Sequence, residues 1–322
     1  MAMMAFALSL ILLSGAALII PPLLRTRKRI RNLPQSHTER ILVLGASSGI
    51  GKEIALQYAS SGRNRICLVG RKKDQLEEAA EECKGLGVES VVSFVGDISS
   101  VEDMLRLREV LESEFGGIDT IIVSAGVSAT RPLLDIAPSD DENGVQRVVD
   151  VASKAMQVNY LGPVVVAVTF IPLLKRTSSS PSILLISSLG AVIPAPTRSI
   201  YGSSKSASLL LYQSLAIEHP DIDWSMVLPS SVKGDFRASA VDGVPDTQRE
   251  GGESNGKVKA EEEVTGKKLH PTDVAKRCIL AIQRRERIVF MPGLMWYAHI
   301  LYWIAPGWIE RRAARKYGFV SR

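Results

Sequence analysis

The sequence has few cysteines and histidines, and neither type is spaced as in a disulfide framework or a metal site. Its three cysteines (Cys67, Cys83 and Cys278) form no CxxC pair, and an odd number cannot all be paired within one chain. This usage argues against a disulfide-rich secreted domain and favours a reducing compartment. The four histidines lie far apart and lack metal-ligand spacing, so we expect no metal centre.

Acidic residues are absent from the first 31 positions, which carry five basic ones. The rest of the chain balances 34 basic against 34 acidic side chains, so the formal net charge of +5 comes from one short N-terminal run. A nucleic-acid-binding protein usually carries its basic excess on a folded surface. We therefore expect no nucleic-acid partner.

Ionisable residues of any kind are missing from residues 1–24, which are mostly Ala, Leu, Ile and Met. A helix of ~20 apolar residues crosses a bilayer. A cleaved signal peptide is the alternative, but it needs basic residues before its apolar run, and here they all follow it. Basic flanks mark the cytoplasmic side. We expect an uncleaved anchor at 1–24 and a basic linker at 25–40, with the body facing the cytosol from the endoplasmic reticulum or another endomembrane.

Residues 288–322 form a C-terminal segment rich in aromatic residues, including Trp296, Trp303 and Trp308. Its apolar run lies between Pro292 and Pro306 and is too short to span a bilayer. Aromatic helices with basic flanks are typical of the membrane interface. Packing on the body or on a second subunit is the other interpretation, and the sequence leaves both open.

The body, residues 41–287, alternates short apolar runs with helical patterns. Runs without polar alternation are typical of strands buried on both faces of a parallel sheet. They occupy residues 41–45, 65–70, 90–96, 120–126, 182–188 and 224–228. The alternation predicts a single-domain α/β fold with a doubly wound parallel sheet of the Rossmann type. Residues 156–174 fit a strand or a buried helix, and the polar stretch 234–268 predicts a surface excursion.

A glycine-rich turn follows the first predicted strand and precedes a predicted helix. Glycines there let the backbone approach a diphosphate, which the amides and dipole of the helix N-terminus attract. A purely structural turn is the alternative, but this placement favours dinucleotide binding. The candidate residues of the turn are Gly45, Ser47, Ser48, Gly49, Ile50 and Gly51.

Arg71 follows the second predicted strand, where an acidic residue would hydrogen-bond the ribose of NAD(H). Gly70 is not acidic, and a guanidinium matches phosphate oxygens. We therefore expect NADP(H), with NAD(H) the less favoured cofactor. Asp97, after the third strand, is a candidate for the adenine amino group or for the cap of a helix at 99–110.

Tyr201 and Lys205 stand four residues apart, on one face of a helix. A phenol with a pKa of ~10 is a poor acid–base catalyst at neutral pH unless a nearby cation lowers that value. Ser188, at the end of a predicted strand, is a candidate donor to a carbonyl oxygen. On its own, a YxxxK spacing is weak support for an enzyme.

Together, these motifs resemble the short-chain dehydrogenase/reductase family. The matching elements are GASSGIG (45–51), GDIS (96–99), SAG (124–126), Asn159 in VNYLG, SS (187–188), YGSSK (201–205) and PSSV (229–232). They run from about residue 41 to residue 282 in the family's order. Within the family, the chain is most similar to the membrane-anchored hydroxysteroid dehydrogenase-like and dehydrogenase/reductase member 7-like enzymes.

The resemblance implies a role for each matching position. Tyr201 would transfer the proton, Lys205 would lower the Tyr201 pKa and hold the nicotinamide ribose, Ser188 would orient the substrate oxygen, and Asn159 would hold a water. The implied cofactor contacts are the glycine turn, Arg71, Asp97, Ala125, Gly126, Asn159, Tyr201, Lys205 and Val232. It also implies that residues 156–174 form a long helix, often used for dimerisation. Ser230 replaces the Gly of the family's Pro-Gly pair, and Gly234 stands near the position of a Thr that commonly helps to hold the nicotinamide carboxamide.

The function we expect is an NADP(H)-dependent oxidoreductase that interconverts a ketone and a secondary alcohol on a lipophilic substrate, such as a steroid, retinoid or lipid, at a membrane. One alternative is a non-catalytic NADP-binding membrane scaffold, and another is a reductase of acyl or polyketide carbonyls.

Overall fold

The computed structural model describes residues 30–31, 33, 37–137, 139–243 and 268–319. The predicted anchor at 1–24, most of the basic linker at 25–40, and most of the excursion at 234–268 lie outside the described residues.

In the part of the chain that the structure describes, seven parallel strands form one sheet, and its order confirms the doubly wound fold predicted from the sequence. The order is β3-β2-β1-β4-β5-β6-β7. The strands are β1 (Glu39–Leu44), β2 (Asn64–Gly70), β3 (Ser90–Val95), β4 (Thr120–Val123), β5 (Ser182–Ile186), β6 (Asp223–Pro229) and β7 (Ile288–Met291). The order reverses between β1 and β4, and the crevice outside the carboxyl ends of strands at such a point is where α/β proteins bind ligands.

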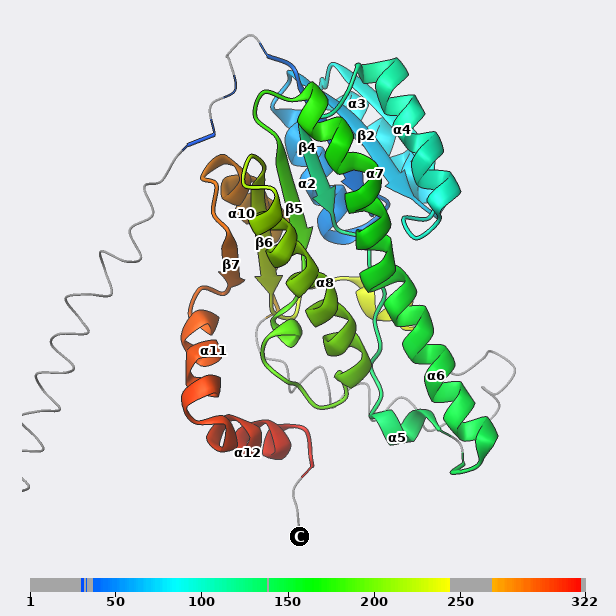
Figure 1. The fold of residues 1–322 in the computed structure, drawn as a ribbon, viewed down its shortest axis with the longest axis vertical. Coiled ribbons are helices and arrows are strands. Elements are labelled where there is room, and N and C mark those ends of the chain that lie inside the picture. Colours follow the sequence, from blue (N-terminus) through cyan, green and yellow to red (C-terminus); the bar gives the residue numbers. More distant parts are fainter. Residues whose placement is uncertain (1–29, 32, 34–36, 138, 244–267, 320–322) are drawn as a thin grey trace, which may run out of the picture.

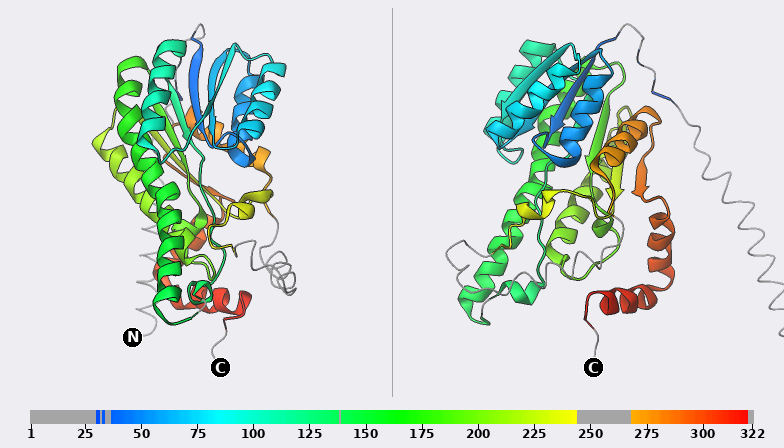
Figure 2. Two further views of the ribbon diagram at one scale, coloured as in Figure 1. Left: turned by 90° about the vertical axis from the view of Figure 1, so that its right-hand side faces the viewer. Right: turned by 180° about the vertical axis from the view of Figure 1, so that it is seen from behind.

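Helices cover both faces of the sheet (Figures 1 and 2). One face carries α4 (Val101–Phe115), α7 (Gly162–Thr177) and α8 (Ser199–Glu218), and the other carries α2 (Gly49–Ser60), α3 (Lys73–Gly85) and α10 (Pro271–Gln283). Alternate residues of β1 feed the two cores: Leu42 and Leu44 join one cluster, Ile41 and Val43 the other. This double burial explains the uninterrupted apolar run in the sequence.

The third strand departs from the expected burial. β3 lies at the edge of the sheet, so none of its residues is fully buried, and Val95 is 46% exposed. The prediction that this run is buried on both faces is therefore wrong for residues 90–96. The apolar pattern alone did not distinguish an edge strand from a central one.

Residues 156–174 are helical, as the family resemblance implied. α6 (Glu142–Met156) continues through a π-helical turn, η1 (Gln157–Leu161), into α7. Among the described residues, this continuous helix is the one apolar and long enough to cross a membrane, but 56% of its most apolar stretch is buried inside the protein. That burial identifies it as a core helix.

Several short elements gather at the carboxyl end of the sheet, the lower side of Figure 1. They are α5 (Leu133–Ile136), η2 (Leu189–Ala191) and η3 (Asp235–Ser239). The C-terminal helices α11 (Met295–Ile304) and α12 (Pro306–Lys316) extend beyond the sheet on the same side, and neither contains a buried residue (Figure 1).

Candidate active site

The glycine turn between β1 and α2 uses each glycine for a different steric reason. Gly45 has a φ of 89°, and a Cβ there would lie 2.5 Å from the backbone nitrogen of Ala125. A Cβ on Gly51 would collide with the carbonyl oxygen of Gly45, so α2 can pack tightly on the strand. Gly49 has a φ of 57° and open space around its Cα at the first turn of α2. This combination gives a diphosphate close access to the helix N-terminus.

The serines of this turn do not block access to the N-terminus of α2. Ser48 is the exposed N-cap of α2, and its side chain makes no capping hydrogen bond. Ser47 packs against the end of β2, where a Cβ on Gly70 would lie 3.2 Å from the Ser47 hydroxyl. Ile50 is partly buried in the first turn of α2. The turn therefore lies beside Gly70, which directly precedes Arg71.

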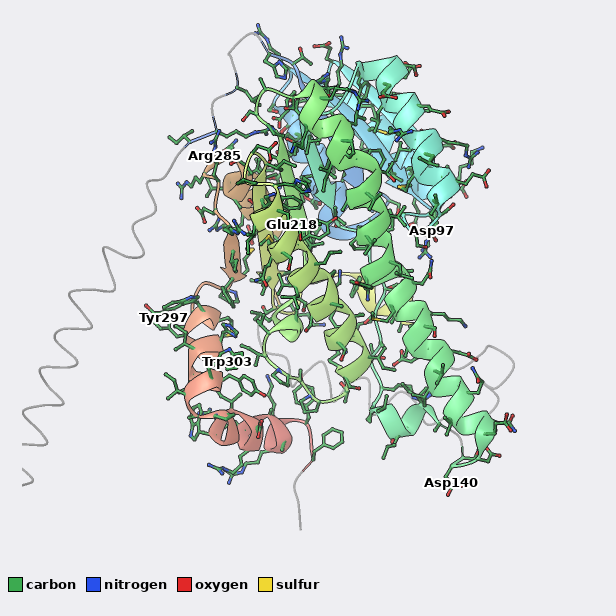
Figure 3. All side chains as sticks on the ribbon, viewed as in Figure 1. Asp97, Asp140, Glu218, Arg285, Tyr297 and Trp303 are labelled. Carbon is green, nitrogen blue, oxygen red and sulfur yellow. The ribbon has the colours of Figure 1, made fainter. Side chains whose placement is uncertain are left out.

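Arg71 and Asp97 follow the neighbouring strands β2 and β3 on the carboxyl side of the sheet (Asp97 is labelled in Figure 3). The Asp97 Oδ1 accepts hydrogen bonds from the backbone nitrogen of Ser99 at 2.9 Å and from its hydroxyl at 2.7 Å. The cap of α4 is Ser100, whose hydroxyl accepts from the backbone nitrogen of Asp103 at 3.1 Å. The alternative prediction that Asp97 caps this helix is therefore wrong.

Lys205 is nearly completely buried beneath the site. Its side chain extends from α8 to the end of β5, where Nζ donates to the carbonyl oxygen of Ile186 at 3.2 Å. The residue is 4% exposed. Burial disfavours the ammonium form and lowers the pKa of Lys205 to about 8.

Tyr201, one turn earlier on α8, lies between three side chains. The Phe236 ring meets it edge-on at 5.9 Å between centroids, and the Arg198 guanidinium lies 5.8 Å from the Tyr201 ring centre. Burial raises the pKa of Tyr201, while a hydrogen bond with Ser188 and the charge of Arg198 lower it. Ser188 and Arg198 thus favour the phenolate, but their effect does not outweigh that of burial.

Ser188 approaches the phenol from a loop rather than from a strand. β5 ends at Ile186, and Ser188 is the N-cap of η2, where its hydroxyl accepts from the backbone nitrogen of Gly190 at 3.1 Å. A Cβ on Gly190 would lie 3.6 Å from the Ser188 hydroxyl and 3.9 Å from the Tyr201 ring. The predicted strand therefore ends earlier than expected, but Ser188 does lie beside Tyr201.

Asn159 is fully buried in the π-helical turn η1, a type of helical irregularity that is frequent at functional sites. Its Oδ1 accepts from the backbone nitrogen of Val127 at 2.8 Å. Its Nδ2 donates to the Val127 carbonyl at 2.9 Å and to the Ser204 hydroxyl at 3.0 Å. The side chain therefore fixes the loop after β4 to α8, a bracing role that the sequence did not indicate.

Gly126 lies where the buried side chains of two helices converge. A Cβ on Gly126 would lie 3.0 Å from Asn159 Oδ1 and 3.0 Å from Lys205 Nζ. Ala125, beside it, donates from its backbone nitrogen to Leu44 at the end of β1 at 2.9 Å. Asn159, Ser188, Tyr201 and Lys205 are thus gathered at the carboxyl ends of β4 and β5, one strand from the glycine turn.

Val232 and Gly234 belong to the segment after β6. Val232 forms an isolated parallel bridge with Leu269 and is partly buried. Gly234 has a φ of 122°, which a threonine would adopt only with strain. The glycine that replaces the family's threonine is therefore required by the backbone here.

Two side chains beside Tyr201 were missed from the sequence. Arg198 stands three residues before Tyr201, so helical spacing was a usable signal for it. Phe236 belongs to the stretch interpreted as a surface excursion, and no local pattern distinguished it.

The sheet order, the glycine turn and the pair of the partly buried Tyr201 and the buried Lys205 together define a dinucleotide-binding type of α/β architecture. The sequence model described as "short chain dehydrogenase" matches residues 39–244. The chain belongs to this short-chain dehydrogenase/reductase family.

Relatives named as hydroxysteroid dehydrogenases and dehydrogenase/reductases support the subgroup. Zebrafish (Danio rerio) dehydrogenase/reductase SDR family member 7B is 30% identical over 281 residues, which cover 84% of this chain and 83% of that protein. Arabidopsis thaliana 11-beta-hydroxysteroid dehydrogenase-like 3 is 37% identical over 197 residues, 61% of this chain. The chain matches 60% of the length of this plant protein.

Solved structures share the fold. A Burkholderia phymatum short-chain dehydrogenase/reductase in complex with NAD superposes with a TM-score of 0.69 at 21% identity, over 84% of this chain and 94% of that one. An alcohol dehydrogenase from Thermococcus sibiricus, complexed with 5-hydroxy-NADP, gives a TM-score of 0.61 at 25% identity, over 79% and 95% of the two chains.

Proposed function

We propose that this protein is an NADP(H)-dependent oxidoreductase that interconverts a ketone and a secondary alcohol on a lipophilic substrate at a membrane. The observation that carries the proposal is the convergence of Ser188, Tyr201 and Lys205 beside an open glycine turn at the carboxyl edge of the sheet. The named relatives and the two structures with bound nicotinamide nucleotides support the same chemistry.

The residues present fit a nicotinamide dinucleotide. Gly49 leaves space for a diphosphate. Arg71 and Asp97 would lie beside the adenosine half. Gly126, Lys205 and Val232 would lie beside the nicotinamide half. When bound, such a cofactor supplies or accepts the hydride. The chain itself binds, orients and handles the proton.

In the reductive direction, Tyr201 is the proton donor to the substrate oxygen. The raised pKa of Tyr201 keeps the phenol protonated at neutral pH but also makes it a weaker acid, so proton donation depends on groups that stabilise the phenolate. The resulting phenolate would be stabilised by the Ser188 hydrogen bond and the Arg198 charge. Ser188 is also placed to orient the carbonyl, and the buried Lys205 and Asn159 brace the floor of the site.

The preference for NADP(H) is supported by charge alone. Gly70 provides no carboxylate to repel a 2′-phosphate, and the Arg71 side chain is 56% exposed and available to meet one. The Oδ1 of Asp97 accepts hydrogen bonds from Ser99, and we propose that its Oδ2 accepts one from the adenine amino group.

Membrane association is supported by the C-terminal helices as well as by the apolar run 1–24. Trp303 and Ile304 are each 75% exposed and Tyr297 is 64% exposed (Figure 3 labels Tyr297 and Trp303 on α11). α12 adds exposed basic residues at Arg311, Arg312, Arg315 and Lys316. We propose that this surface lies at the interface of the cytosolic leaflet, where a lipophilic ketone is enriched.

A homodimer is supported by a separate apolar surface on α7 and α8. Val168 is 72% exposed, Leu210 66% and Ile217 76%. Exposed apolar patches of this kind often mark protein interfaces. We propose that a second copy of the chain covers them.

The enzymatic proposal is tested by NADPH oxidation with a panel of lipophilic ketones. Tyr201→Phe should reduce turnover by about a thousandfold, as loss of a general acid does. Tyr212→Phe is the matched control: it lies on the same helix, is buried, and its hydroxyl donates to the Pro163 carbonyl at 3.2 Å, away from the site. Equal rates for wild type and Tyr201→Phe contradict the proposal. NADPH binding without turnover over the whole panel favours the scaffold alternative.

The membrane proposal is tested by sedimentation with phosphatidylcholine vesicles containing phosphatidylserine. Replacing Trp303 and Ile304 by Ser in a chain that lacks residues 1–24 should weaken binding by about tenfold or more, since each buried apolar side chain contributes ~1.5–3 kcal/mol. Leu134→Ser, at an 83% exposed position on α5, is the control. Unchanged binding in the double variant refutes the interfacial role of α11.

A further inference from the structure

Residues 128–131, which follow β4, are bonded to two other segments that both contact Tyr201. One is the start of α8 with Arg198, and the other is the segment 235–242 after β6. On one side, Nη1 of Arg198 donates to the Ser128 hydroxyl at 2.9 Å and to the Ala129 carbonyl at 3.1 Å. On the other, the Ser128 backbone bonds the segment after β6: its nitrogen donates to the Ser239 hydroxyl at 3.3 Å, and its carbonyl accepts from Val241 at 2.9 Å. Ser128 itself is fully buried.

Asp242 fastens the second segment to residues 128–131. Its Oδ2 accepts from the backbone nitrogens of Thr130 at 2.5 Å and Arg131 at 2.7 Å. The residue is 2% exposed, and its Oδ1 has no hydrogen-bond partner in the part of the chain that the structure describes. A buried carboxylate is costly unless it is well bonded, so two charge-assisted bonds to consecutive amides are its main compensation here.

Both segments end on the phenol ring of Tyr201. Before α8, the Arg198 guanidinium lies 5.8 Å from the ring centre of Tyr201. In the segment after β6, residues 235–242, the Phe236 ring meets the Tyr201 ring edge-on at 5.9 Å between centroids. Phe236 is 44% exposed, so packing alone does not fix it. The segment that carries Phe236 is bonded to residues 128–131 through Ser239, Val241 and Asp242.

We propose that Asp242 is a positioning residue for the reaction: through residues 128–131 it holds Phe236 and Arg198 around Tyr201, and so sets the orientation of the phenol and the width of the substrate's approach. The proposal rests on the proposed function, because it takes Tyr201 as the proton donor. It predicts that Asp242, whose carboxylate bonds the backbone of residues 130 and 131, governs which ketones are accepted.

The first experiment measures amide hydrogen exchange in the full chain. Asp242→Ala leaves two partly buried amides without their acceptor, so exchange at Thr130, Arg131 and Val241 should accelerate by about tenfold or more. Asp242→Asn, which keeps an acceptor oxygen, should accelerate it less. Exchange unchanged in both variants overturns the proposal, whether or not any substrate has been found. If Asp242→Ala does not fold, the Asn variant decides.

The second experiment measures substrate selectivity. Asp242→Ala should change the ratio of kcat/KM for a bulky over a small ketone by about tenfold, with NADPH affinity unchanged. Phe236→Ala should change the same ratio in the same direction. The double variant should be no worse than the more impaired single one, because both act through the position of Phe236. Additive effects, or an unchanged ratio in Asp242→Ala, refute the positioning role.

Asp119→Asn is the matched control. Asp119 is also a buried, multiply bonded aspartate, but it lies just before β4 at the amino end of the strand, opposite the site. Its loss should lower stability and leave both the selectivity ratio and exchange at Thr130 and Arg131 unchanged. A wild-type chain that reduces no ketone refutes the proposed function, while the exchange data still decide the role of Asp242.

Discussion

The Arg71 guanidinium lies 3.6 Å from the Asp97 carboxylate, with the two side chains 56% and 33% exposed. The two residues proposed to hold the adenosine half of the cofactor therefore face each other. An ion pair this exposed contributes at most about 1 kcal/mol, so Arg71 can turn to a stronger partner at little cost. A 2′-phosphate with up to two negative charges is such a partner.

Arg71→Ala should therefore change cofactor preference. Charge-assisted hydrogen bonds contribute ~1.5–3 kcal/mol, so NADPH affinity should fall by roughly 10- to 100-fold while NADH affinity stays the same. Binding followed by nicotinamide fluorescence gives both constants. Lys73→Ala is the control, because Lys73 is a nearby cation, 69% exposed, that pairs with Glu77. Equal losses for NADPH and NADH would show that Arg71 does not recognise the phosphate.

Gly126→Ala should impair the site without unfolding the protein. The added methyl group would lie 3.0 Å from Asn159 Oδ1 and from Lys205 Nζ, so both buried side chains must shift. Misplacing catalytic groups by a few tenths of an ångström should lower kcat by about tenfold to a hundredfold. Gly85→Ala, where nothing lies within 4 Å of the added group, is the control. Wild-type turnover in Gly126→Ala would mean that the Asn159–Lys205 convergence does not matter to the reaction.

The sequence was informative wherever the signal is local. The β1 run, the glycine turn and the Tyr201–Lys205 spacing all lie within a few residues, and the structure places each on the expected type of element. Strand order depends on pairing between distant segments, which explains why the edge position of β3 was not predicted. The pKa of Tyr201 likewise depends on Ser188 and Arg198, whose contacts are known only once the loops are placed.

Asp242 illustrates the limit most clearly. It bonds amides 111 and 112 positions earlier in the chain, and its surrounding sequence is polar and rich in glycine, which is typical of a surface loop. No spacing rule connects residues so far apart. A single sequence therefore indicates the reacting groups better than the residues that hold them in place.

Asp119 predicts part of the acid sensitivity of the fold. Although burial opposes its ionisation, hydrogen bonds from Arg40, Ser178 and His37 hold the pKa of Asp119 down at about 2. Because this value lies below the ordinary 3.8, the stabilisation is present above pH 4 and is lost as the pH falls through 2. Asp119→Asn should lose about 2 kcal/mol at pH 7, measured by urea unfolding, and show a shallower decline between pH 4 and 2. If the free energy of unfolding of the variant declined between pH 4 and 2 as steeply as that of wild type, this explanation would be contradicted.

Lys205 predicts the opposite dependence at alkaline pH. Burial lowers its pKa to about 8 from 10.5, so between these values the unfolded chain binds more protons than the folded one. Folding is therefore penalised at pH 7, and the penalty disappears as the pH rises through 8 towards 10.5. Lys205→Met removes the charge and the hydrogen bond to Ile186 while nearly keeping the volume. Its free energy of unfolding relative to wild type should fall by up to about 3 kcal/mol between pH 7 and 10.5, one pKa unit being about 1.4 kcal/mol. Buried thiols and phenols that also titrate in this range are common to both proteins and cancel in the difference. A difference that does not change with pH would mean that Lys205 remains fully charged in the folded protein, and the buried amine could not then exchange protons near neutral pH.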